Sequence, residues 1–292
     1  MKILVTGANG QVGFCLTQLL AKTAWDYKAL TRKELDITDL NAVQEIVNNY
    51  TPNIIINAAA YTAVDKAEAE VAAANAINCI GAGYLAQAAN DIGAAIFHIS
   101  TDYVFAGDAL EPYSETDAVA PQGVYGESKL RGEEIVAANN PHHIILRTAW
   151  VFCEHGNNFV KTMIRLGLDR EQLGVVADQM GAPTYAGDIA NSLMILVNKY
   201  AGENLLQWGV YHYSGFPQAS WYEFAQEIFA EANAQNIYEK SVPNLKPIAT
   251  ADYPTPAKRP ANSRLNCGKI QQIFGVELSD WKQALKNIKA YK

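Results

Sequence analysis

The sequence predicts an α/β fold, with a doubly wound parallel sheet and a smaller mixed α/β region. Two patterns support this prediction: short apolar runs alternate with longer helix-like runs through the first half of the chain, and a glycine-rich turn follows the first apolar run. After about residue 150 the alternation is lost, and Pro, Gly, Tyr and Trp become frequent. We therefore expect the second part of the chain to be less regular.

The first half divides into expected elements. Runs read as strands are 2–7, 26–31, 53–60, 94–100 and 142–152, and runs read as helices are 14–24, 40–50 and 69–91. Four to seven consecutive apolar residues suit strands that are buried on both faces, as in a parallel sheet.

The composition of the chain argues against some classes of binding partner. The chain has 292 residues, 49% of them hydrophobic, and a formal net charge of -7. It has no basic run to follow a phosphate backbone, so nucleic acid is an unfavourable partner. It lacks a secretory signal pattern and any apolar stretch near about 18 residues, so we expect a cytoplasmic protein that does not enter a membrane. Its four cysteines are widely separated and are expected to be reduced.

The glycine turn predicts a dinucleotide site. Gly7, Gly10 and Gly13 have GxxGxxG spacing, directly after a strand and before a helix. Glycines let the backbone approach a pyrophosphate, and the helix N-terminus offers free amides and the positive end of its dipole. This context indicates a Rossmann-type fold. The cofactor-binding residues expected in the turn are Gly7, Asn9, Gly10, Gln11 and Val12.

The second strand bears on the choice of cofactor. A carboxylate at its end would hold a ribose 2'-hydroxyl, whereas an Arg accommodates a 2'-phosphate. Here Thr31 is followed by Arg32, which favours NADPH, although Glu34 and Asp36 lie close enough to leave NADH as an alternative. Asp36 and Ile37 are placed beside the adenine, and the small residues Ala58, Ala59 and Ala60 are expected to form a flat surface against the cofactor.

Three polar residues are candidates for catalysis. Thr101 follows an apolar strand, where a doubly wound sheet places its ligand site. Tyr125 and Lys129 are four residues apart in a helical stretch and share one face. A lysine cation near a tyrosine would lower the phenol pKa toward neutrality, so we expect Tyr125 to transfer a proton, while Thr101 binds the carbonyl oxygen and Lys129 holds the nicotinamide ribose.

With the glycine turn, these residues resemble the extended short-chain dehydrogenase/reductase family. The blocks NAAAYTAVDKAE, STDYVF, GNNF, DQMGAPT and YPTPAKRPANSRL are similar to the dTDP-4-dehydrorhamnose reductase family. The resemblance implies reduction of the C4 keto group of dTDP-4-dehydro-L-rhamnose to dTDP-L-rhamnose by NADPH. It implies substrate contacts from Val64, Thr101, Asp102, Tyr125, Trp150, Asn158, Arg259 and Asn262, with Phe159 and the DQMGAPT loop beside the nucleotide. A neighbouring Arg264 is a further candidate for the diphosphate.

On this resemblance, we expect residues 1–150 to form the NADP-binding Rossmann domain, with part of 173–212 returning to it. Residues 151–172 and 213–292 are expected to form the nucleotide-sugar-binding region. No metal site is expected, because no His, Cys, Asp or Glu cluster has ligand spacing. The chain is expected to be a monomer or a homodimer.

Two alternatives remain. The first is a nucleotide-sugar epimerase or dehydratase; in the dehydratases the active-site Thr precedes Asp-Glu, whereas Thr101 precedes Asp102 and Tyr103. The second is a non-catalytic regulatory subunit of the same fold. The presence of Thr101, Tyr125 and Lys129 together argues against it.

Overall fold

A six-stranded parallel sheet forms the larger part of the protein. The computed structural model describes residues 1–203, 206–238 and 242–292. The strands, in spatial order, are β2 (Asp26–Leu30), β1 (Lys2–Thr6), β3 (Ile54–Asn57), β4 (Ala95–Thr101), β5 (His143–Thr148) and β10 (Gly209–His212). Each neighbouring pair is parallel. Each of the predicted strands 2–7, 26–31, 53–60, 94–100 and 142–152 overlaps a strand of this sheet, whereas β10 was not predicted.

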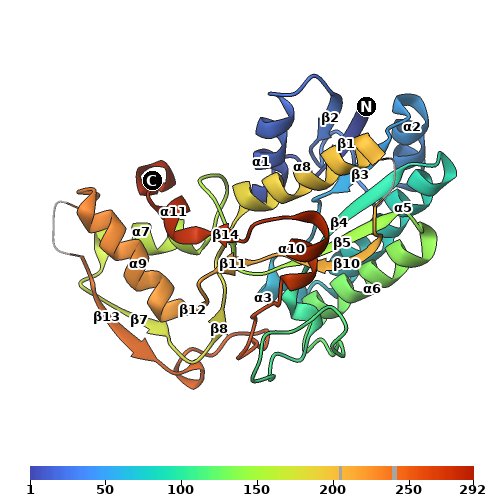
Figure 1. The fold of residues 1–292 in the computed structure, drawn as a ribbon. Coiled ribbons are helices and arrows are strands. Elements are labelled where there is room, and N and C mark those ends of the chain that lie inside the picture. The colour runs from blue at the N-terminus through green and yellow to red at the C-terminus, as the bar shows by residue number, and fades with distance from the viewer. Residues whose placement is uncertain (204–205, 239–241) are drawn as a thin grey trace.

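Helices cover both faces of the sheet (Figure 1). Alternate side chains of a strand point to opposite faces. Ile3 and Val5 of β1 belong to the core under α1 (Gln11–Leu20) and α8 (Ala186–Glu203), whereas Leu4 belongs to the core under α2 (Leu40–Tyr50), α5 (Ala82–Asp91) and α6 (Val124–Asn139). All three β1 side chains are fully buried. The doubly wound fold predicted from the sequence is confirmed.

The order of the strands places a ligand site at the carboxyl ends of β1 and β3. From β1 the chain passes to β2 on one side, and then returns to β3 on the other. Such a reversal leaves a crevice beyond the carboxyl ends of the two adjacent strands, where doubly wound proteins bind ligands. The glycine turn follows β1, and the alanine triplet follows β3, so both predicted cofactor segments lie at this crevice.

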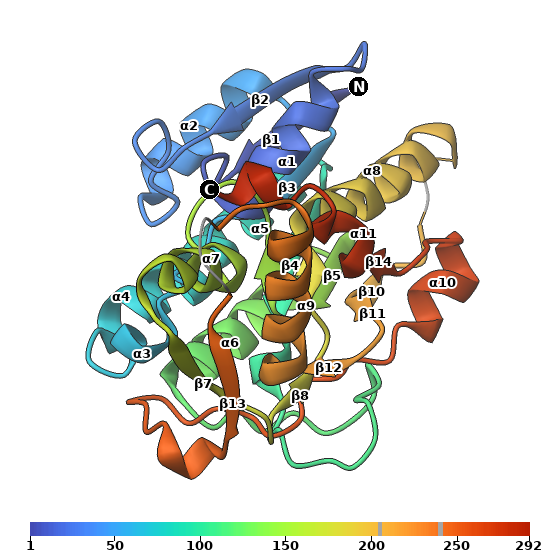
Figure 2. The same ribbon diagram turned by 90° about the vertical axis from the view of Figure 1, so that its left-hand side faces the viewer.

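A second region packs around a core of its own (Figure 2). Its larger elements are α7 (Phe159–Asp169), α9 (Trp221–Ala234), and the parallel pair β7 (Gln172–Val176) and β13 (Asn244–Ile248). Phe152, Val160, Phe224, Ile228 and Trp281 are buried between them. Residues 204–205 and 239–241, which fall in the ranges predicted for the two regions, lie outside the described residues.

The remaining elements are shorter. They are α3 (Val64–Ala67), α4 (Val71–Asn75), the 3-10 turn η2 (Asp102–Val104), β6 (Val151–Phe152), β8 (Met180–Gly181), β9 (Thr184–Tyr185), β11 (Gly215–Phe216), β12 (Ala219–Ser220), η3 (Thr250–Asp252), α10 (Gly268–Phe274), β14 (Ser279–Asp280), α11 (Trp281–Leu285) and η4 (Ile288–Tyr291). Two-stranded pairs join β6 to β9, β8 to β12, and β11 to β14.

One predicted helix is interrupted. The run 69–91 contains α4 and α5, with a π-helical segment, η1 (Ala76–Gly81), between them. The wider turn coincides with Asn78, whose amide bonds both the N–H and the carbonyl of Tyr61 and also donates to the hydroxyl of Ser128. π-Helical turns often occur at functional sites, and this one braces the loop after β3. In the described part of the chain, no helix is long and apolar enough to cross a membrane.

Candidate active site

The glycine turn brings the chain into close contact with the end of β3. Gly7 has a φ of 70°, a conformation that residues with a Cβ rarely adopt. A Cβ at Gly7 would lie 2.5 Å from the backbone nitrogen of Ala59, and one at Gly13 would collide with the carbonyl oxygen of Gly7. Gly10 is the N-cap residue of α1, and no side chain among the described residues caps that helix. The amides of its first turn are therefore available for an anion.

A cavity of about 350 Å³ opens beside this turn. Nine residues that the sequence assigns to the cofactor line it: Gly7, Asn9, Gly10, Arg32, Asp36, Ile37, Ala58, Ala59 and Ala60. It is also lined by Leu35, Tyr61, Thr62, Ala63 and Ile77, which the sequence did not single out. They come from loops and from η1, where no motif spacing indicates a ligand contact.

Arg32 and Asp36 form the charged edge of this cavity. Arg32 Nη2 lies 3.6 Å from Asp36 Oδ2, and the Arg32 side chain is 74% exposed. Hydrogen bonds from the hydroxyl and the N–H of Thr38 hold the pKa of Asp36 below its usual range. Asp36 therefore stays anionic and bonded to its own loop, while Arg32 remains accessible to an anionic ligand.

Gln11 and Val12 were also predicted to bind the cofactor, but they do not line the first cavity. The Gln11 amide donates to the Val151 carbonyl and accepts a hydrogen bond of 3.0 Å from Asn158. It therefore ties the first turn of α1 to the segment that leads into α7. The side chain of Val12 packs in the core, which leaves only its backbone at the surface of the turn.

The three predicted catalytic residues come from two adjacent elements. Thr101 is the last residue of β4, and Tyr125 and Lys129 lie one turn apart near the start of α6. Thr101 and Lys129 are buried, whereas Tyr125 is partly exposed. The Thr101 hydroxyl donates a hydrogen bond of 3.0 Å to Asp102 Oδ1.

The pKa of Tyr125 differs from the expectation. Desolvation raises it above the ordinary value for tyrosine, and the nearby Asp102 carboxylate adds to the increase. Lys129 is not among the groups that shift this pKa; its Nζ donates to the Ile99 carbonyl at 2.6 Å and lies 3.2 Å from His98 Nε2. The expectation that Lys129 brings the Tyr125 pKa toward neutrality is therefore wrong.

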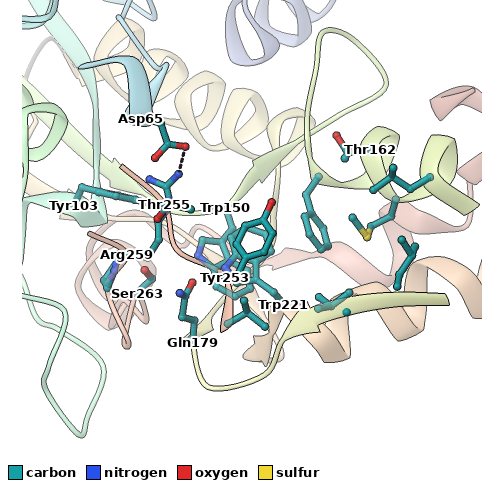
Figure 3. Close-up of a pocket in the computed structure, with 18 of the residues that line it drawn as sticks. Asp65, Tyr103, Trp150, Thr162, Gln179, Trp221, Tyr253, Thr255, Arg259 and Ser263 are labelled. Carbon is teal, nitrogen blue, oxygen red and sulfur yellow. Dashed lines mark hydrogen bonds and ion pairs between the residues drawn. The ribbon is translucent and has the colours of Figure 1, made fainter. Parts of the chain in front are cut away.

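A second cavity, of about 510 Å³, lies between the two regions (Figure 3). Its apolar wall is made largely by residues of α7 and β7 with Trp221 of α9, and its polar side by Asp65 of α3 and the loops that contain Gln179 and Arg259. Tyr103 also lines it and packs edge-on against Tyr125, with ring centroids 5.3 Å apart. Tyr103 thus connects the predicted proton donor to the cavity.

Aromatic rings form one side of the second cavity. Trp150 stacks on Trp221 with ring centroids 3.5 Å apart, and Phe159 lies 4.7 Å from the same Trp221 ring. Trp150 has a φ of 48°, an uncommon conformation for a residue with a side chain. Trp150 and Phe159 were expected near the substrate, and both line the cavity. Trp221 was not expected there, because it begins a long amphipathic helix that reads as core.

An ion pair anchors the polar side of the second cavity. Arg259 Nη2 lies 2.6 Å from Asp65 Oδ2, as Figure 3 shows with a dashed line. In the described part of the chain, Arg259 Nη1 is buried and has no hydrogen-bond partner. An unpaired buried guanidinium nitrogen is costly, so this group is suited to an anionic ligand in the cavity.

Six residues predicted to contact the substrate do not line either cavity: Val64, Thr101, Asp102, Tyr125, Asn158 and Asn262. The Asn262 amide donates to the carbonyls of Ala109 and Glu111, and its oxygen accepts from Arg264. Arg264 in turn donates to the Leu110 carbonyl. Both side chains brace the 107–113 loop, an arrangement that their position in a Pro-rich segment did not reveal.

Comparisons with known proteins agree with these features. Residues 1–291 match the family model described as the RmlD substrate binding domain. The chain is 52% identical to a dTDP-4-dehydrorhamnose reductase of Aggregatibacter actinomycetemcomitans, over 99% of both proteins. A crystal structure of such a reductase from Clostridium acetobutylicum is 42% identical, has a TM-score of 0.91, and matches 99% of this chain and 98% of its own.

The reductase from Bacillus anthracis was crystallised in complex with NADP. It is 40% identical, with a TM-score of 0.89, over 100% of this chain and 99% of its own. The full-length match to the family model, together with these identities, places this chain in the dTDP-4-dehydrorhamnose reductase family.

Proposed function

We propose that this protein uses NADPH to reduce the C4 keto group of dTDP-4-dehydro-L-rhamnose, giving dTDP-L-rhamnose. One observation supports the proposal most strongly: two of the predicted catalytic residues are linked by side-chain contacts to the two cavities, one to each. Tyr125 contacts Tyr103 of the second cavity, and Lys129 is linked through His98 and Asn57 to Ala59 of the first. A cofactor in the first cavity and a sugar nucleotide in the second would then meet beside Tyr125.

The first cavity fits a dinucleotide. The close approach of Gly7 to Ala59 leaves no room for side chains there, and the uncapped start of α1 in the described chain offers amides to a pyrophosphate. Arg32 would pair with a 2'-phosphate, and Ile37 with Ala58 would flank the adenosine. When bound, the cofactor supplies the hydride.

The second cavity fits a nucleotide sugar. Trp150, Phe159 and Trp221 offer flat apolar surfaces for a base, and the free Nη1 of Arg259 suits a phosphate oxygen. Because the cavity reaches Tyr103, the sugar end of such a ligand would lie toward Tyr125. On this proposal, residues 151–172 and 213–292 bind the nucleotide sugar and residues 1–150 bind NADPH, with part of 173–212 returning to the cofactor domain.

Tyr125 would donate the proton. Its pKa is raised by desolvation, so the phenol keeps its hydrogen at neutral pH. The sugar oxygen would become an alkoxide as hydride arrives, and an alkoxide is basic enough to take that hydrogen. Thr101 would bind the same oxygen after its hydroxyl turns away from Asp102, to which it now donates. Lys129 would hold the cofactor ribose. A cytoplasmic location and a monomeric or homodimeric state stay predictions.

The test is a direct assay of purified protein with dTDP-4-dehydro-L-rhamnose and NADPH. We expect loss of NADPH absorbance equal to the substrate consumed, with dTDP-L-rhamnose as the product. NADH run in parallel measures cofactor preference. An epimerase or dehydratase would change the sugar with no net oxidation of NADPH, and a regulatory subunit would bind ligand without turnover, so either result would contradict the proposal.

A further inference from the structure

A carboxylate on α3 holds the loop that carries Arg259. Residues 254–260 belong to no helix or strand, so contacts with other segments must fix their position. Asp65 Oδ1 accepts a hydrogen bond of 3.2 Å from the N–H of Ala257, and Asp65 Oδ2 accepts one of 2.6 Å from Arg259 Nη2. Figure 3 shows the second of these contacts. One side chain therefore binds both the backbone and the guanidinium of the loop.

The contact with Asp65 also sets the orientation of the Arg259 guanidinium. This group is planar, so a hydrogen bond at Nη2 fixes the direction of Nη1 as well. Nη1 is buried and has no hydrogen-bond partner in the described chain, and Arg259 lines the second cavity. The orientation that Asp65 imposes thus leaves Nη1 available for an anion there.

Glu68, the residue that follows α3, holds the start of α6. Its Oε1 accepts a hydrogen bond of 2.9 Å from the N–H of Val124, the first residue of that helix. The N-cap residue, Gly123, has no side chain that could do so, and a Cβ there would lie 2.7 Å from the same oxygen. The carboxylate therefore binds an amide that the helix leaves unpaired, beside the positive end of its dipole. Tyr125 is the next residue of α6.

A third contact joins the loop directly to the segment that leads into α6. Lys258 Nζ, from the middle of the loop, donates to Gln122 Oε1 at 3.1 Å. Each of the three segments is therefore bonded to the other two. Such a closed set of contacts constrains the position of Arg259 relative to Tyr125.

We propose that Asp65 and Glu68 are positioning residues, which keep the Arg259 loop and the Tyr125 end of α6 at a fixed separation. Asp65 acts through Arg259, and Glu68 acts through the first turn of α6. This proposal deepens the proposed function and rests on it for the effect on turnover. A sugar nucleotide held at its phosphate by Arg259 would present its sugar to Tyr125 only while both contacts are kept.

Two other roles for Asp65 predict different results. The side chains of Asp65 and Arg259 are 40% and 22% exposed, and an ion pair so open to solvent contributes little to stability. Loss of Asp65 should therefore leave the urea midpoint of unfolding nearly unchanged. A carboxylate near an anion site also repels the anion, so a purely electrostatic role predicts tighter nucleotide binding without Asp65. Positioning predicts weaker binding.

The first test measures the affinity for dTDP by isothermal titration calorimetry. Asp65→Ala removes both contacts with the loop, and we expect it to weaken dTDP binding by roughly tenfold or more. KM for the sugar nucleotide should rise similarly, with a smaller change in kcat. Asp65→Asn keeps an oxygen for the Ala257 N–H but loses the ion pair, so its affinity should be intermediate. Lys66→Ala is the matched control, because it changes an exposed side chain of the same helix. Unchanged or tighter dTDP binding in Asp65→Ala would overturn the proposal.

The second test separates Glu68 from Asp65. Glu68→Ala should lower kcat by roughly tenfold and leave dTDP binding unchanged, because the contact that it loses positions Tyr125 rather than Arg259. Glu68→Gln keeps an oxygen for the Val124 N–H, so we expect it to recover most of the rate, a recovery that general damage to the fold would not allow. An undiminished kcat in Glu68→Ala, or no recovery in Glu68→Gln, would contradict the proposed role.

The dTDP titration involves no turnover, so the two proposals can fail separately. If Asp65→Ala binds dTDP as well as the unaltered protein does, the positioning role is lost even when reduction is observed. If the unaltered protein binds dTDP and Asp65→Ala binds it weakly, but no reduction occurs, the positioning of Arg259 stands and the proposed reaction does not.

Discussion

Trp150 lies flat on Trp221, with ring centroids 3.5 Å apart and ring planes 10° apart. The first residue follows β5 of the large sheet, and the second begins α9 of the smaller region. A stacked pair of indoles at this place joins the two regions and presents aromatic surface to the second cavity.

Gly181→Ala should disturb this pair. A Cβ at Gly181 would collide with the six-membered ring of Trp150, so the indole must shift from its stacked position on Trp221. We expect KM for the sugar nucleotide to rise roughly tenfold with a smaller change in kcat, since the affected surface is remote from the reacting atoms. Gly202→Ala is the matched control, because a Cβ there meets no heavy atom of the described structure within 4 Å. Equal kinetics in both variants would separate Trp150 from substrate binding.

Arg32→Ala should weaken NADPH binding by roughly 10- to 100-fold, with little change for NADH. The reason is that a charge-assisted bond to the 2'-phosphate is lost, and NADH has no such group. Lys33→Ala is the control, since Lys33 is exposed but does not line the cavity. Titration of cofactor fluorescence measures all four affinities. If Arg32→Ala weakened both cofactors equally, the residue would not lie at the 2'-phosphate.

Tyr125→Phe should reduce kcat by roughly 100- to 10,000-fold and leave NADPH affinity nearly intact, because the ring stays and only the proton donor is removed. Tyr103→Phe is the comparison, since it removes the neighbouring phenol and should affect kcat far less. Steady-state kinetics with a parallel cofactor titration distinguish the two. A Tyr125→Phe enzyme with the original rate would exclude Tyr125 as the donor.

Asp102→Asn should stabilise the protein at pH 7. Burial raises the pKa of Asp102 to about 6, and in the described chain Asp102 Oδ2 has no hydrogen-bond partner. Between about pH 4 and 6 the folded state therefore binds more protons than the unfolded state, so stability falls as pH rises through that window. We expect a gain of about 1–3 kcal/mol in the free energy of unfolding at pH 7.

The same gain should shrink as pH falls from about 6 toward 4, because the native carboxyl is then protonated. Denaturant unfolding at pH 7 and pH 4.5 measures both values. Asp91→Asn, at an exposed carboxylate, provides the control and should change little at either pH. A gain that is the same at both pH values would show that ionisation of Asp102 is not its cause.

Local patterns in the sequence were sufficient to predict five of the six strands of the sheet, all but β10, and most of the lining of the first cavity. Runs such as 53–60 are apolar enough to identify buried strands, and the GxxGxxG spacing locates Gly7 at its turn. The segment that contains Arg32 and Asp36 was identified in the same way, because cofactor contacts in this fold follow the ends of consecutive strands. The α6 helix likewise places Tyr125 and Lys129 one turn apart, as their spacing predicts.

The second cavity was less predictable because it depends on contacts between distant segments. Trp221 reaches it only because α9 packs beside the loop of Trp150, and Asp65 only because it pairs with Arg259, 194 residues away in the sequence. Asn262 is the opposite case. It lies in a motif that was expected to bind the substrate, yet its amide donates to the backbone carbonyls of Ala109 and Glu111. The position of the Lys129 amine depends likewise on His98 and Asn57, which belong to two other strands.

The most direct test of the proposed reaction follows the hydrogen itself. NADPH carrying deuterium at C4 of the nicotinamide is incubated with the protein and dTDP-4-dehydro-L-rhamnose, and the product is examined by NMR and mass spectrometry. The account predicts dTDP-L-rhamnose with one deuterium at C4 of the sugar. A product without deuterium at that carbon, or no product despite demonstrated binding of both ligands, would contradict it.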